Sequence, residues 1–143
     1  MDYLELGESY GPSRYVLVLK DKLTHYCELV VADSPTSATA AENVIDWHYR
    51  FGLPETWVSD NGSHFKASLM DQLAEQLKVV QKWINGTVAR VNRDILLQVL
   101  RVMLMELKLD TRNWPFLLPL IQANLNHSAM ASLGGHAPIA LFT

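Results

Sequence analysis

Residues 50–65 read Arg-Phe-Gly-Leu-Pro-Glu-Thr-Trp-Val-Ser-Asp-Asn-Gly-Ser-His-Phe. The Gly-Leu-Pro run predicts a helix end followed by a turn, and residues 56–58 predict a short buried strand. Residues 65–77 then show the apolar spacing of a helix, so the local order is strand, loop, helix. In α/β proteins this order presents ligand-binding side chains at the carboxyl end of a strand, and Asp60 occupies that place.

The segment before this stretch predicts two strands and a helix. Residues 15–19 and 25–31 are runs of strand-forming residues separated by a turn-like sequence, which indicates an antiparallel hairpin. Residues 33–37 supply a cap and a proline for a helix over residues 35–49, whose apolar side chains recur at helical spacing. This mixture of strands and helices predicts an α/β domain.

The segment after Val80 predicts mainly helix. Amphipathic segments cover residues 87–107 and 113–126, with a turn at residues 110–112, and residues 134–142 read as a turn and a short closing segment. Apolar residues on the first helix cover more than one narrow stripe. That breadth is typical either of a buried helix or of a helix with one flank on a partner chain.

Length and composition limit the class of protein. With 143 residues, the chain has the length of one domain, and we expect residues 1–143 to form a single one. No apolar run reaches the roughly 20 residues of a membrane span, and the amino terminus is acidic where a secretory signal is basic. Cys27 is the single cysteine, which excludes an internal disulfide. We therefore expect an intracellular protein, nuclear or cytoplasmic, with no membrane partner.

Charge is distributed unevenly. The formal net charge of −3 argues against binding of nucleic acid through overall charge. Residues 78–101 nevertheless hold five basic residues and one acidic residue, a net of 5 − 1 = +4, so the rest of the chain carries −3 − 4 = −7. A local basic stripe of this kind is typical either of a solvated helix face or of a surface that contacts phosphates at one place.

Four stretches resemble, in order, the integrase core of gypsy-like retrotransposons and retroviruses. They are residues 1–4, 50–65, 85–93 and 113–138, and together they span nearly the whole chain. The second is the most specific, because Phe-Gly-X-Pro, a strand and then Asp-X-Gly-Ser-X-Phe is hard to obtain by chance. The resemblance implies a ribonuclease H-like α/β fold, with a mixed central sheet of about five strands flanked by helices.

The resemblance also implies a chemistry, polynucleotidyl transfer assisted by two Mg²⁺ or Mn²⁺ ions. The ions stabilise the attacking and leaving oxygens at a phosphodiester and need anionic oxygen ligands, usually three carboxylates. Asp2 matches the first catalytic and metal-binding carboxylate, Asp60 matches the second, and the third is expected at position 89, which is Ala89 here. Alanine has no side-chain oxygen. We therefore expect one weakly bound ion or none, and loss of DNA strand transfer.

Two further features concern the third carboxylate. Asp94 is a poor substitute, because five helical steps of about 100° place it far round the helix from position 89. Asp60 and Ala89 are also only 89 − 60 = 29 positions apart, several fewer than in the family. The missing residues fall near residues 79–84, so we expect the last edge strand to be shortened. A single substitution, natural or engineered, explains Ala89 alone, whereas a degenerate element explains both features and a deliberately shortened chain explains the spacing.

Candidate contacts to nucleic acid come from the basic stripe and from the resemblance. They are Lys82, Arg90, Asn92 and Arg93. Three functions remain open: a retrotransposon-derived nucleic-acid-binding domain that has lost catalysis, a repurposed protein–protein interaction module that keeps the fold and a dimer interface, and a variant of an active strand-transfer enzyme. We expect DNA as the ancestral partner, a homodimer, and a protein partner if the domain is repurposed.

Overall fold

The computed structural model describes residues 1–52, 54–59, 67–83 and 87–142. The side chains of residues 2, 83 and 87–95 also lie outside the described part, although their backbone belongs to named strands and helices.

Three antiparallel strands form the first sheet. β1 (Asp2–Glu5) pairs with β2 (Tyr15–Lys20), and β2 pairs with β3 (Cys27–Ala32). The predicted hairpin is therefore confirmed, and the opening strand that the resemblance implies is β1. Residues 16–19 of the central strand β2 are all at most 6% exposed. Burial on both faces explains why β2 reads as a continuous apolar run.

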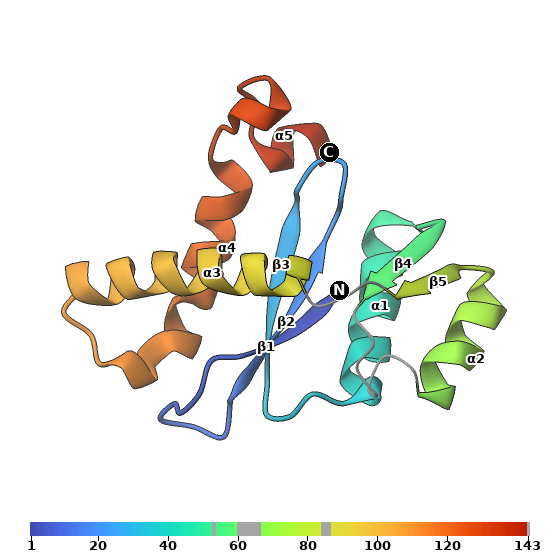
Figure 1. Cartoon of the computed structure of the whole chain (residues 1–143), viewed down its shortest axis with the longest axis horizontal. Helices are drawn as coiled ribbons and strands as arrows, with labels where there is room; N and C mark the ends of the chain where they lie inside the picture. The colour runs from blue at the N-terminus through green and yellow to red at the C-terminus, as the bar shows by residue number, and fades with distance from the viewer. Residues whose placement is uncertain (53, 60–66, 84–86, 143) are drawn as a thin grey trace.

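Two parallel strands form a second sheet. β4 (Thr56–Ser59) leads through α2 (Ser68–Leu77) to β5 (Val80–Trp83), and all four residues of β5 pair with β4. The amino group of Met1 donates a hydrogen bond to the carbonyl oxygen of Val58 over 2.9 Å, which joins the free edge of β1 to β4 (Figure 1). The strand order is β1-β2-β3 in the first sheet and β4-β5 in the second. β5 is as long as its partner β4, so the edge strand is present despite the short spacing.

The helices agree with the sequence prediction to within a few residues at their ends. α1 (Ser37–Phe51) begins two residues later than predicted, because the side chain of Thr36 caps it by accepting a hydrogen bond from the backbone N–H of Thr39. The remaining elements in chain order are α3 (Thr87–Glu106), the 3-10 turn η1 (Thr111–Asn113), α4 (Trp114–His127), the 3-10 turn η2 (Ala131–Leu133) and α5 (Pro138–Phe142).

The sheet separates two apolar cores because successive residues of β2 point to opposite faces. Val16 and Val18 pack with α3 and α4, in a core that also contains Leu4. Leu17 and Leu19 pack on the other face, in the core that includes α1 and α2 (Figure 1). The described part of the chain therefore has the layers of the predicted ribonuclease H-like fold, with a three-stranded antiparallel sheet and a two-stranded parallel sheet flanked by helices.

Helix α3 has one buried face and one exposed apolar flank. Leu96, Leu100 and Leu104 are buried against the sheet, whereas Val102 and Met105 are exposed. The buried-helix interpretation is confirmed for the first face. The second face is exposed. A helix with one flank on a partner chain, the alternative interpretation, requires such an exposed face. Among the described residues, no helix is long and apolar enough to cross a membrane.

Candidate metal and nucleic-acid site

β1 and β4 meet at the candidate site. Met1, whose amino group is bonded to the carbonyl oxygen of Val58, directly precedes Asp2 in the sequence, and Val58 stands two residues before Asp60. A metal site shared by Asp2 and Asp60 requires their neighbours in the sequence to lie close together, and the Met1–Val58 hydrogen bond meets that requirement. Asp60 and the side chain of Asp2 lie outside the described residues, so the pairing of their carboxylates stays a prediction.

Tyr3 attaches β1 to the start of α1. Its hydroxyl donates a hydrogen bond to the carbonyl oxygen of Thr36 over 2.8 Å. Partial burial raises the pKa of Tyr3 above its ordinary value of 10.0, and hydrogen bonds with Thr39 and Thr36 oppose part of that rise. Leu4, the next residue, packs in the core on the α3 side. β1 is therefore fixed from both layers of helices, directly after Asp2.

Helix α3 carries position 89 on its sheet-facing side. Leu96 and Leu100 of α3 are buried in the same core as Leu4 of β1. Position 89 is seven residues before Leu96 and eleven before Leu100, which places it within about 20° of both along the helix surface. It also lies in the first turn of α3, which begins at Thr87. A glutamate at this position would start from the side of the helix that faces β1.

Three other acidic residues, Asp94, Glu28 and Glu5, lie away from position 89 or are engaged elsewhere. Counting from position 89 puts Asp94 about 140° away around α3. Glu28 forms a bidentate ion pair with Arg50 and accepts a hydrogen bond from the Tyr26 hydroxyl. The hydrogen bonds that Arg50 donates to Glu28 are the largest cause of the raised pKa of Arg50. Glu5 is exposed at the far end of β1.

The predicted donor set is one carboxylate short of the three that usually hold a pair of metal ions. Among the described residues, no group of three or more His, Cys, Asp or Glu side chains could hold a metal. The resemblance supplies two carboxylates, at Asp2 and Asp60, and alanine at the third position. Two carboxylates and water fit a single Mg²⁺ or Mn²⁺ ion, since these ions accept water as a ligand.

The predicted nucleic-acid contacts are divided between two elements. Lys82 is exposed on β5 and stands opposite Val58 of β4 in the sheet register. Arg90, Asn92 and Arg93 belong to the first two turns of α3, and their side chains lie outside the described residues. Lys82 is therefore one strand away from the Met1–Val58 contact, on the side of β4 opposite β1.

The basic stripe extends beyond this site. Lys78, with a left-handed backbone at the end of α2, is exposed, as is Arg101 on α3. Arg101 is twelve residues after position 89, which corresponds to about 18 Å along the helix axis. Charge counted along the sequence therefore overstates the charge that gathers at one place.

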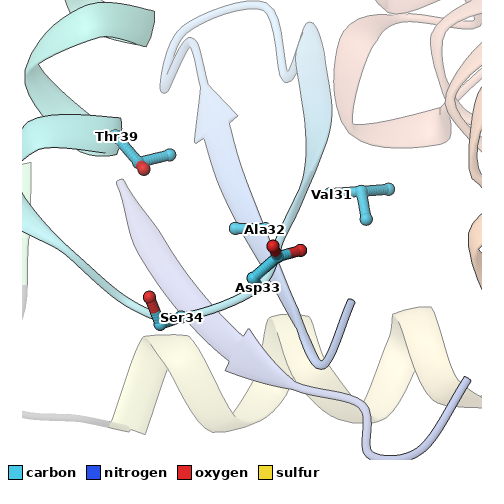
Figure 2. Close-up of a pocket in the computed structure, with 5 residues that line it drawn as sticks. All are labelled: Val31, Ala32, Asp33, Ser34 and Thr39. Carbon is cyan, nitrogen blue, oxygen red and sulfur yellow. The ribbon is translucent and has the colours of Figure 1, made fainter. Parts of the chain in front are cut away.

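A polar cavity of about 350 Å³ lies at the connection from β3 to α1 (Figure 2). Its lining comprises Val31, Ala32, Asp33, Ser34 and Thr39, which Figure 2 shows on the end of β3, the connecting segment and α1. The described part of its lining contains one carboxylate, Asp33.

Sequence reasoning missed the contacts that hold the site's strands. Tyr3 follows Asp2 directly, but its partner Thr36 is 33 residues away in the sequence. The Met1–Val58 bond spans 57 residues and uses only backbone groups. Neither contact leaves a periodic or local signal in the sequence.

Similar amino-acid sequences occur in viral polyproteins. No protein-family model matches the chain. It is 34% identical over 128 residues to the Gag-Pol polyprotein of Avian reticuloendotheliosis virus, a match that covers 83% of the chain and 11% of the polyprotein. It is 31% identical over 130 residues to the Gag-Pol polyprotein of Koala retrovirus, covering 84% and 7% respectively. The chain thus spans about a tenth or less of the curated relatives it matches.

Solved structures with a similar fold include an integrase catalytic core domain. The trimeric form of the HTLV-2 integrase catalytic core domain in complex with magnesium has a TM-score of 0.74 at 16% identity, covering 99% of this chain and 94% of that one. The chain is homologous to retroviral Pol polyproteins and has the integrase catalytic-core fold. The dimeric form of the same HTLV-2 domain gives a TM-score of 0.69 at 17% identity, covering 90% of this chain and 83% of that one. The integrase-core resemblance inferred from the sequence is therefore confirmed.

Replacing Tyr3 tests how β1 is held next to Asp2. Tyr3→Phe removes the hydrogen bond to Thr36 and should lower the free energy of unfolding at pH 7 by about 0.5–1 kcal/mol. The folded-state pKa of Tyr3 is raised, so its stabilising contribution is fully present below about pH 10 and is lost as the pH rises through the folded-state pKa. The difference from the parent chain should therefore shrink above that pH.

Urea unfolding at pH 7 and at pH 10–11 measures both effects. Tyr49→Phe is the matched control, because Tyr49 is exposed on α1, and it should change the free energy by less than about 0.5 kcal/mol. Equal effects of the two substitutions at pH 7 would contradict the assigned role of Tyr3.

Proposed function

We propose that this chain is an integrase-core-like domain that binds nucleic acid through one face and has lost polynucleotidyl transfer. The ancestral activity is two-metal processing and strand transfer of DNA ends. Homology to retroviral Pol polyproteins supports that ancestry. The domain acts inside the cell, in the nucleus or the cytoplasm, with DNA as its ligand.

The observation that carries the proposal is the alanine in the first turn of α3. Position 89 lies on the sheet-facing side of the helix, in line with Leu96 and Leu100. The resemblance expects the third carboxylate at this position, where alanine has no side-chain oxygen. A second ion would keep one protein carboxylate while it faces the charge that develops on the phosphodiester, which is too little to stabilise the transition state.

The remaining site residues support binding without catalysis. Asp2 and Asp60 supply oxygen ligands for one Mg²⁺ or Mn²⁺ ion. When bound, the ion neutralises part of a nearby phosphate's charge. Lys82 and the residues Arg90, Asn92 and Arg93 add contacts to the phosphate backbone. Such contacts give affinity without sequence specificity and weaken with salt.

An exposed apolar face favours a second candidate function, protein–protein interaction. Phe116 and Leu120 of α4 are 77% and 51% exposed, and residues 116, 119, 120 and 123 recur at helical spacing. Residues 114–126 contain no acidic or basic side chain. This face suits a homodimer or another protein partner, and it becomes the main functional surface if neither metal nor DNA binds.

Metal binding is expected to be weak and limited to one ion. Asp60→Asn should abolish Mn²⁺ binding measured by calorimetry or by electron paramagnetic resonance, because it removes one of two carboxylates. Glu75→Gln, an exposed acid on α2, removes the same charge away from the site and should leave binding unchanged. Two bound ions per chain, or Mn²⁺ binding that survives Asp60→Asn, would count against the assigned ligands.

DNA binding is expected to depend on Lys82. Lys82→Ala should weaken binding to duplex DNA and reduce the slope of log affinity against log salt by about 0.9, one phosphate contact. Lys22→Ala is the control, since Lys22 is equally exposed in the β2–β3 turn and outside the site. Fluorescence anisotropy over a range of salt concentrations measures the slopes. Identical slopes for the two variants would remove Lys82 from the interface, and absence of any DNA binding would favour the protein-interaction function.

A further inference from the structure

β3 is the outer strand of the sheet, and its outer edge is occupied by a helix. An exposed strand edge offers unpaired N–H and C=O groups to which a strand of another chain can add. Backbone groups of alternate residues point to the same edge, so Cys27, Leu29 and Val31 present theirs away from β2. α4 packs along this edge (Figure 1).

Two amide side chains of α4 bind the outer edge in the way a strand would. Asn126 accepts a hydrogen bond from the Cys27 N–H over 2.9 Å and donates one to the Cys27 carbonyl over 2.8 Å. Gln122 accepts a hydrogen bond from the Leu29 N–H over 2.8 Å. We call these two side chains, Gln122 and Asn126, the edge cap.

The spacing of the edge cap matches the strand. Residues four apart on a helix are separated by about 6 Å along its axis. Residues two apart on a strand are separated by about 6.6 Å. The edge cap can therefore bond to Leu29 and Cys27 at the same time, and neither α4 nor β3 has to bend.

Burial makes the edge cap costly to lose. Asn126 is 3% exposed, and an amide this deeply buried is unfavourable unless its oxygen and nitrogen are both bonded. The surroundings are dry enough that burial raises the pKa of the Cys27 thiol to about 11. The next outward residue, Val31, is 36% exposed, and one open residue is too short for a strand to add.

We propose that the edge cap is a conformational guard that takes the place of a further strand and prevents a second copy of the chain from adding to β3. The guard does not depend on the proposed nucleic-acid function, because none of its residues belongs to the candidate site. Removal of the guard should expose backbone groups of Cys27 and Leu29 and allow association through β3.

Asn126→Ala tests the guard directly. Hydrogen exchange of the Cys27 amide should become about tenfold faster or more, since the buried hydrogen bond from its N–H to Asn126 is lost. Sedimentation velocity should show additional concentration-dependent association relative to the parent chain, with increased strand content in the infrared spectrum. Asn124→Ala, the same change at an exposed position of α4, should alter neither. A folded Asn126→Ala chain with the exchange and association of the parent would overturn the proposal.

Gln122 provides a second pair of variants if Asn126→Ala does not fold. Among the described residues, the hydrogen bond of the Gln122 side chain uses its oxygen, so Gln122→Glu keeps the acceptor and Gln122→Ala removes it. Exchange at Leu29 should stay slow in Gln122→Glu and accelerate in Gln122→Ala, and only Gln122→Ala should associate further. The same exchange and association in both variants would overturn the guard.

Discussion

The packing of α3 on the first two strands is the contact on which the site depends. Leu96 and Leu100 are buried against Leu4 of β1 and Val18 of β2, and this core fixes both the height and the rotation of the helix over the sheet. Because an α-helix is rigid over two turns, the same contact fixes position 89. The fold can therefore preserve the site's scaffold while one residue removes its chemistry.

This separation of scaffold from chemistry explains how an integrase-core fold persists without three carboxylates. The cores on the two faces of the sheet use apolar residues of β2, α1, α3 and α4, and none of them depends on a metal. Alanine at position 89 removes a metal ligand from the predicted site. Two surfaces then remain available for binding. They are the basic residues around β5 and the exposed apolar face of α4.

Local patterns predict much of the fold, and long-range contacts account for the rest. The hairpin, the helices and the β4 strand follow from apolar periodicity and from turn residues such as Gly52. The start of α1 was predicted at residue 35, and the Thr36 side chain moves it, which is a capping choice that propensity alone leaves open. β5 was expected to be shortened from the spacing of the acidic residues, yet the register shows all four residues paired with β4.

The site was predictable only as a set of residue types. Asp2, Asp60 and Ala89 follow from the resemblance, whereas the contacts that bring their elements together do not. Met1 bonds to Val58 through backbone atoms, and Asn126 reaches β3 across 99 residues of sequence. Such contacts depend on the packed tertiary structure. The sequence predicts the residue types of the site, and the packed structure shows the contacts that hold the neighbouring strands.

The most direct test of the account is metal-dependent cleavage and strand transfer of DNA by the unaltered chain, measured beside Asp60→Asn in Mg²⁺ and in Mn²⁺. The account predicts that the unaltered chain yields no more product than Asp60→Asn, because position 89 offers no ligand to a second ion. Product above that background, lost on Asp60→Asn, would show that the chain is an active enzyme and would contradict the central claim.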